Sequence, residues 1–287
     1  MSTQYTPYET KPPQPDLDPT RSSAAKPLMI LLAIIGGIVL LFVIATTIFT
    51  SATGLSRGTA TLTADATGVQ TLEVDASAAQ FTLEFAAVDE ATLATQGLSA
   101  DRWELQRRGD TLRVDSPSPW FNWCFFNCNR GENQVTLTLP EQLNDGSLSA
   151  EVELNAGQLH ADGAFDQLAV ELNAGEARVN GTARTLDAQV NAGDANLSIA
   201  GVENANFEVA AGRLTTELTG SAPTTTEIEV NAGQLNLTLP DETYAVTSDV
   251  TAGSLDNRLT VLPDSQYRIA VELAAGDVRL LTGAQSG

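Results

Sequence analysis

The chain has 287 residues, of which 36 are acidic and 15 basic, so its formal net charge is −21. Such an excess of acid argues against a nucleic-acid-binding protein, which needs a surface rich in lysine and arginine. With one histidine, His160, and two cysteines, Cys124 and Cys128, the chain cannot build a histidine-rich metal site, a four-cysteine zinc site or a dense disulfide scaffold.

The first 27 residues predict a disordered tail. Tyr5 to Pro19 contains five prolines and hardly any large aliphatic residue, so this stretch cannot bury enough apolar surface to offset the entropy lost on ordering. We interpret residues 1–27 as a solvated tail, and a docking peptide for a partner is the alternative.

Residues 28–50 predict one transmembrane helix in contact with the lipid bilayer. Leu28 to Phe49 carries no charge, and at about 1.5 Å per residue it spans about 33 Å, close to the thickness of the hydrocarbon core. Arg21 and Lys26 precede this stretch, and the next basic residue after it is Arg57. Because basic flanks stay in the cytoplasm, we expect a single-pass protein of the cell membrane with a cytoplasmic N-terminus. Residues 51–60 then form a linker, and the remainder is extracytoplasmic.

An internal repeat dominates the rest of the chain. Seven glycines, each preceded by alanine, recur every 18 to 23 residues: Gly157, Gly175, Gly193, Gly212, Gly233, Gly253 and Gly276. In four copies an asparagine stands before the alanine: Asn155, Asn173, Asn191 and Asn231. Stacked asparagine side chains satisfying one another and nearby turn groups explain this pattern better than a ligand site, because other copies carry alanine or threonine there.

Hydrophobic residues alternate on both sides of each glycine. They fall five, three and one residues before it, and two, four and six residues after it, as in Val152 and Leu154 or in Leu235, Leu237 and Leu239. Alternation predicts strands with one buried face, and the phase slips by one residue at the glycine, so the chain must bend there. Glycine suits such a corner because it tolerates positive φ, and the preceding alanine suggests a corner too tight for a large side chain.

These corners predict an all-β fold, a β-solenoid of stacked coils of about 18–23 residues. A sandwich of ordinary hairpins is less consistent with the same corner repeated seven times. An eighth copy fits around Val74 and Phe81, with Ala79 in the place of the glycine. We therefore treat residues 61–287 as one extracytoplasmic solenoid domain.

Residues 116–132 interrupt this pattern with an aromatic and cysteine-containing loop. The aromatic residues are Trp120, Phe121, Trp123, Phe125 and Phe126. Cys124 and Cys128 are candidates for a small disulfide loop, because an oxidised pair is the default outside the cytoplasm. The loop is interpreted as a cap over one end of the solenoid. Docking onto a partner or onto the membrane interface is the alternative.

No catalytic or metal-binding motif is present. His160 falls on an outward phase, between Leu159 and Ala161, and the chain has no nucleophile elbow, phosphate-binding loop, zinc motif or calcium-binding repeat. We expect no catalytic residue, no cofactor and no required metal.

The Asn-Ala-Gly corners within alternating strands, behind one transmembrane helix, resemble the bacterial putative-adhesin or toast-rack β-solenoid family over about residues 61–287. The resemblance implies a non-catalytic cell-envelope protein, which here would mediate surface interaction or adhesion. It also implies an alternative, an accessory or sensor component of cell-envelope stress signalling. The envelope ligand is unknown, and the acidity disfavours anionic partners.

Overall fold

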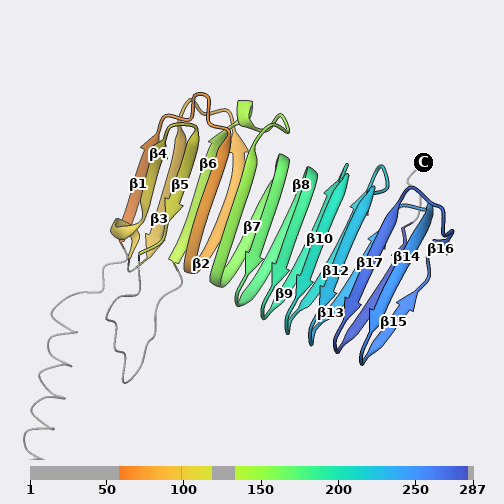
Figure 1. Ribbon diagram of the computed structural model, residues 1–287. Coiled ribbons are helices and arrows are strands. Elements are labelled where there is room, and N and C mark those ends of the chain that lie inside the picture. The colour runs from red at the N-terminus through yellow and green to blue at the C-terminus, as the bar shows by residue number, and fades with distance from the viewer. Residues whose placement is uncertain (1–57, 98, 118–132, 284–287) are drawn as a thin grey trace, which may run out of the picture. The chain divides into compact units, whose positions relative to one another are not determined.

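The computed structural model describes residues 58–97, 99–117 and 133–283 of the chain (Figure 1). The expected tail (1–27), the expected span (28–50), and the five aromatic residues and two cysteines of the loop lie outside these residues. Within the described part, no helix is long and apolar enough to cross a membrane. Ser56–Gly287 forms one compact unit.

The described residues are all-β apart from two single-turn 3₁₀-helices. The strands are β1 Gly58–Ala64, β2 Thr71–Ala86, β3 Ala91–Gly97, β4 Glu104–Arg108, β5 Thr111–Asp115, β6 Asn133–Pro140, β7 Ser149–Leu172, β8 Gly175–Val190, β9 Asp194–Ala200, β10 Asn204–Val209, β11 Arg213–Thr219, β12 Thr225–Val230, β13 Gln234–Leu239, β14 Thr243–Val250, β15 Ser254–Asn257, β16 Thr260–Val261, β17 Arg268–Leu273 and β18 Asp277–Thr282. The short helices are η1 Ala100–Arg102 and η2 Glu141–Leu143. The predicted all-β class is confirmed. Strand β1 begins at Gly58, so the last three residues expected as linker are part of a strand.

The strands form flattened coils, each of which contributes one strand to each of two stacked ladders. The first sheet contains the strands that precede the corners: β5, residues 71–76 of β2, residues 149–154 and 167–172 of β7, residues 185–190 of β8, and then β10, β12, β17 and β14. The second sheet contains the strands that follow them: residues 79–86 of β2, 157–165 of β7 and 175–183 of β8, and then β9, β11, β13, β18 and β15. Neighbouring coils pair in parallel (Figure 1), whereas β1–β3–β6 and β4–β5 are antiparallel.

The core lies between the two sheets and is built from alternate residues of every strand. Val152 and Leu154 before one corner and Leu235, Leu237 and Leu239 after another are fully or almost fully buried, as the alternation predicts. The alanine before the corner glycine behaves differently. Five of the seven are exposed, which corrects the expectation of an inward-facing alanine in a tight corner. The corner points these side chains into solvent, so the tight contact is made by the glycine alone.

The coils do not stack in chain order at the C-terminal end. After β13 the chain passes to the outermost position, forms β14 and β15, and then returns to insert β17 and β18 between the two coils. In space, the corner at Gly276 therefore lies between those at Gly233 and Gly253. The sequence could not show this, because all the corners carry the same motif and a long connection, residues 258–267, permits either order.

The eighth copy at the other end is in register with the others. Ala79 pairs with Gly157, Val74 with Val152 and Phe81 with Leu159, so the coil of β2 stacks directly on the first coil of β7. On its other side β2 pairs with β5 and β6, which come later in the chain. The chain order is thus rearranged at this end too.

Tyr244 links the outermost coil to the loop that precedes it. Its ring is fully buried, and its hydroxyl donates a hydrogen bond of 2.8 Å to the carbonyl of Pro240. Burial raises the pKa of the Tyr244 phenol well above its ordinary value, and the negative charge of Glu242 adds to the effect.

Because the folded-state pKa of Tyr244 is raised, the unfolded chain releases this proton first as the pH rises above about 10, and stability falls from there upward. In Tyr244→Phe this loss is absent, so we expect the unfolding midpoint to decline less steeply with alkaline pH than in the wild type. Thermal unfolding monitored by circular dichroism at stepwise alkaline pH measures the two slopes. If the midpoint fell equally steeply with pH in the wild type and in Tyr244→Phe, the raised pKa of Tyr244 would be contradicted.

Candidate interaction surface

The seven corner glycines stack in a column, where each approaches the backbone of the next coil. Gly175 illustrates why the corner needs glycine. Its φ is +117°, and a Cβ built on it would lie 2.1 Å from the carbonyl oxygen of Gly157. The same close approach recurs through the column, Gly157 meeting Ala79, Gly193 meeting Gly175, Gly212 meeting Gly193, Gly233 meeting Gly212, Gly276 meeting Gly233, and Gly253 meeting Gly276. The parallel stacking of the coils, as much as the bend itself, therefore requires glycine.

A ladder of amide side chains runs beside the first three corners of this column. Asn155 donates to Asp75 Oδ1 at 3.2 Å, Asn173 donates to Asn155 at 3.2 Å, and Asn191 donates to Asn173 at 2.8 Å. Asn231 stands apart, because the coils beside it carry alanine at this position, and it donates to Glu229 instead at 3.2 Å. The amides are used in mutual hydrogen bonds, which supports their structural interpretation.

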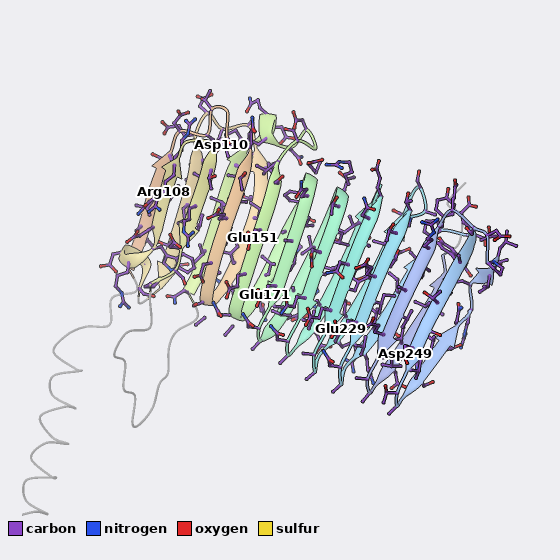
Figure 2. The ribbon with its side chains drawn as sticks, viewed as in Figure 1. Arg108, Asp110, Glu151, Glu171, Glu229 and Asp249 are labelled. Atoms are coloured by element: carbon purple, nitrogen blue, oxygen red, sulfur yellow. The ribbon has the colours of Figure 1, made fainter. Side chains whose placement is uncertain are left out.

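The outer surface of the first sheet carries a column of acidic side chains. In spatial order its members are Asp115, Asp75, Glu153, Glu171, Gln189, Glu208, Glu229, Glu272 and Asp249. Eight of the nine are carboxylates, one on each coil, and the strands that carry them lie about 4.8 Å apart. Figure 2 labels Glu171, Glu229 and Asp249 along this surface.

Further carboxylates flank the column two residues earlier on the same strands. They include Glu73, Glu151, Asp187 and Glu227. We call the outward residues of the first sheet from β2 to β14 the acidic face. Its first-sheet strands within residues 149–230 contain no lysine or arginine.

The two ends of the acidic face differ. At the β5 end, Arg113 places Nη1 2.9 Å from Glu73 and Nε 2.9 Å from Asp115. The hydrogen bond to Asp115 and the adjacent negative charges raise the pKa of the Arg113 guanidinium, which offsets part of the negative charge at this end. From Glu153 onward no ion pair joins a column carboxylate to an arginine among the described residues.

An unpaired column of like charges has an electrostatic cost. Two unit charges about 4 Å apart repel by about 1 kcal/mol even in bulk water. Salt screens this repulsion, whereas a ligand of opposite charge removes it. The column therefore produces a strong negative potential along one side of the solenoid.

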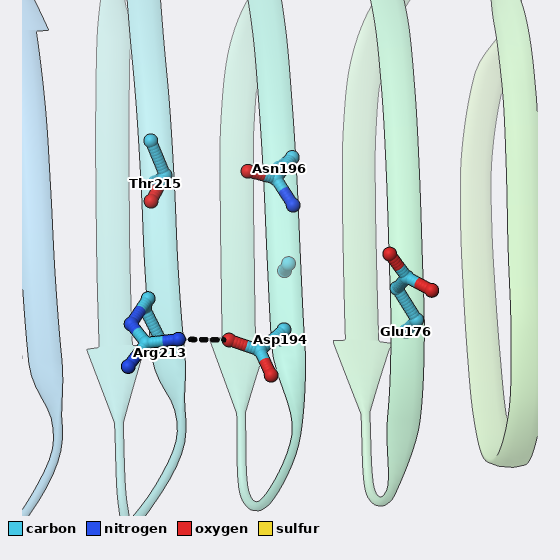
Figure 3. Close-up of a pocket in the computed structure, with 6 residues that line it drawn as sticks. Glu176, Asp194, Asn196, Arg213 and Thr215 are labelled. Atoms are coloured by element: carbon cyan, nitrogen blue, oxygen red, sulfur yellow. Dashed lines mark hydrogen bonds and ion pairs between the residues drawn. The ribbon is translucent and has the colours of Figure 1, made fainter.

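The second sheet has a mixed surface instead. Arg213 extends toward Asp194, with Nη1 2.9 Å from Oδ1 (Figure 3). Arg178 forms an ion pair with Glu176. A shallow depression of about 430 Å³ lies here, lined by Glu176, Asp194, Ala195, Asn196, Arg213 and Thr215. Because acid and base alternate between neighbouring strands, this side has no continuous field of one sign.

His160 lies on the second sheet, half exposed, with Nε2 2.9 Å from Asp162 Oδ2. On the neighbouring strands Thr82 and Arg178 occupy the adjacent outward positions. The described part of the chain also holds no group of three or more His, Cys, Asp or Glu side chains placed to bind a metal ion.

Two features were not identified from the sequence, although the spacing of residues in the sequence carries a signal for each. Every member of the acidic column from Asp75 onward stands four residues before its corner position, so acid spacing would have revealed it. A second glycine contact lies away from the corners: a Cβ on Gly181 would lie 1.8 Å from the carbonyl oxygen of Gly163, 18 residues earlier.

These features define a class of protein: a two-layered, largely parallel β-solenoid with stacked glycine corners. The chain belongs to the Toastrack DUF4097 family, whose sequence model matches residues 69–286. The family resemblance drawn from the Asn-Ala-Gly corners is thus confirmed.

The comparison with solved structures matches chains from several bacteria. A putative cell adhesion protein from Clostridium sporogenes is 9% identical and covers 79% of this chain and 100% of its own, with a TM-score of 0.38. A putative adhesin from Bacteroides fragilis is 12% identical and covers 79% and 98%, with a TM-score of 0.41. A putative lipid binding protein from Parabacteroides distasonis is 12% identical and covers 78% and 97%, with a TM-score of 0.32. No curated protein matches the sequence.

Proposed function

We propose that the protein is a non-catalytic, membrane-anchored protein of the cell envelope whose extracytoplasmic solenoid binds a surface ligand through its acidic face. The observation that carries the proposal is the column of carboxylates, one per coil, without arginine or lysine along its central part. Glu153, Glu171 and Glu229 each accept a hydrogen bond from a corner asparagine, but an uncharged amide oxygen could accept the same bond, whereas like charges in neighbouring strands oppose stacking. Their presence is explained if the face meets a cationic ligand.

The chemistry of the face specifies the class of ligand. Carboxylates repeated at strand spacing favour an extended polycation or a surface that displays amines, and they disfavour anionic lipids and acidic wall polymers. Anchoring through residues 28–50, with a cytoplasmic N-terminus, would present this face outside the membrane.

Binding to poly-L-lysine tests this proposal directly on the purified full chain in detergent. A quadruple variant, Glu153→Gln, Glu171→Gln, Glu208→Gln and Glu229→Gln, neutralises the four central carboxylates of the column while keeping the shape of the side chains. At about 0.3–0.5 kcal/mol for each exposed charge, we expect affinity to fall about tenfold or more.

A matched control removes the same charge from the second sheet, with Glu84→Gln, Glu176→Gln, Glu217→Gln and Asp277→Asn. We expect its affinity to stay within about threefold of the wild type, because these charges are dispersed among bases and neutral residues. Equal losses in both variants would show that only net charge matters. Absence of wild-type binding at physiological salt would also contradict the proposal.

The alternative, a component of envelope stress signalling, rests on the 27-residue tail expected on the cytoplasmic side. Deleting residues 2–20, which keeps Arg21 and Lys26 in front of the expected span, separates the two functions. Surface binding by the solenoid should survive this deletion, whereas a signalling role through the tail should be lost with it. A deletion phenotype equal to that of the whole gene would favour signalling.

A further inference from the structure

The end of the solenoid formed by residues 243–262 is open. Strand β14 pairs with β17 on its inner side, and β15 pairs with β18 (Figure 1). On the outer side only β16 is present, and it pairs with Thr243 and Tyr244 at the start of β14. No described strand pairs with the outer edge of the rest of β14.

Apolar side chains are exposed at this same end. The large hydrophobic residues exposed on the described part of the chain are Val250 (40%), Val261 (50%) and Leu262 (50%), all in this outermost coil and the loop that follows it. In β12 and β17 the inward residues are buried, whereas in β14 the inward positions carry Val246, half-buried, and Ser248 and Val250, both exposed. The core is therefore uncovered here.

The hydrogen bonds of β14 show which backbone groups are free. Ala245 donates its N–H to Tyr267, and Thr251 donates to Leu273, so the odd-numbered residues face the inner neighbour. Because backbone groups alternate sides along a strand, those of Val246, Ser248 and Val250 point outward. Leu262 donates to Tyr244 from the outer side, so β16 closes the edge up to that residue. The free window is residues 246–250, between β16 and the corner.

We infer that this window pairs with the same window of a second copy of the chain, antiparallel about a twofold axis at Ser248. The five residues read Val-Thr-Ser-Asp-Val, which is nearly symmetric about its centre. Antiparallel pairing then sets Val246 opposite Val250, Ser248 opposite Ser248 and Thr247 opposite Asp249 of the other copy. The pairing supplies about six backbone hydrogen bonds, and each copy covers the open core of the other.

Neighbouring registers are worse for reasons visible in the structure. An axis at Asp249 would set that carboxylate directly opposite its own copy, and like charges in opposed strands repel. An axis at Thr247 would place Val250 opposite Tyr244, where β16 already occupies the edge. The proposed contact leaves the acidic face uncovered, so it is independent of the proposed ligand.

Cysteine cross-linking of the full chain in detergent tests the register. In a Cys124→Ser, Cys128→Ser background, Ser248→Cys brings two Cα atoms to about 5.5 Å across the axis, within disulfide range. The matched control is Thr247→Cys, whose Cα atoms would lie about 8 Å apart given the rise and spacing of strands. Under mild oxidation we expect covalent dimer from Ser248→Cys and little from Thr247→Cys.

A second measurement keeps the native cysteines and so does not depend on how the background folds. Sedimentation should show a wild-type dimer whose population rises with concentration. Ser248→Lys sets two ammonium groups against each other and should give monomer, whereas Thr247→Lys faces Asp249 and should stay dimeric. Both side chains are exposed in the single chain, so far-ultraviolet circular dichroism at 25 °C should show that both variants are folded. Equal cross-linking of the two cysteine variants, or a dimer population unaffected by Ser248→Lys, would overturn the proposal.

Discussion

Gly175→Ala is expected to destabilise the solenoid by about 3 kcal/mol or more. Positive φ in a residue with a side chain costs about 1–3 kcal/mol, and the new Cβ would lie 2.1 Å from Gly157 O and 2.9 Å from Gly157 N. Because these neighbours are backbone atoms of a stacked coil, relief requires separating the two coils and weakening the parallel ladder. Chemical denaturation monitored by circular dichroism measures the loss.

Gly68→Ala is the matched control for this prediction. Gly68 also has positive φ, at +71°, but a Cβ there would meet nothing within 4 Å. Only the conformational cost of about 1–2 kcal/mol remains. If the two variants lost equal stability, the bend alone would explain the corner glycines, and the stacking argument would be wrong.

Phe207→Ala should cost about 3–5 kcal/mol, the range for removing a fully buried phenylalanine. The side chain of Phe207 is completely buried between Ala188 on one neighbouring coil and Ile228 on the other. Ala188 is small and a solenoid repeat contacts only its neighbours, so the cavity cannot be filled from the adjacent coil.

The adjacent residue supplies the control for this cavity. Glu208→Ala removes an outward side chain from the same strand and should change stability by less than about 0.5 kcal/mol. The free energies of unfolding of both variants, extrapolated from urea titrations, give the comparison. A loss below about 1 kcal/mol for Phe207→Ala would mean that the core between these coils is loosely packed.

The acidic face must stay soluble, whereas the outer edge of β14 at the open end must be able to pair with another strand. Repeated carboxylates keep the outer surface of the sheet soluble and discourage sideways association. In the outermost strand, β14, the one charged outward residue is Asp249. In the proposed register Asp249 lies opposite Thr247 of the other copy, so the edge of β14 pairs without setting like charges opposite each other.

The sequence predicted best the features that a single residue type determines, namely the buried strand positions and the glycine corners. Alternating apolar residues predicted the buried positions from Val152 to Leu239, and the repeated glycines predicted corners, because each signal is local to a few residues. The direction of the alanine side chain before each corner glycine was predicted less well, because that direction depends on how the neighbouring coil packs against the corner. The aromatic loop and its cysteines stay a prediction.

By itself the sequence determined the all-β class, the repeat length, the corner glycines and the family. Only the tertiary structure decided the order of the coils, with Gly276 stacked between Gly233 and Gly253, and hence which strand edge is left free. Equivalent corner motifs are interchangeable in a stack, so nothing local to them records their order in space. The alignment of the carboxylates into one column follows from the register between coils, which is set by backbone pairing and core packing across residues far apart in the chain.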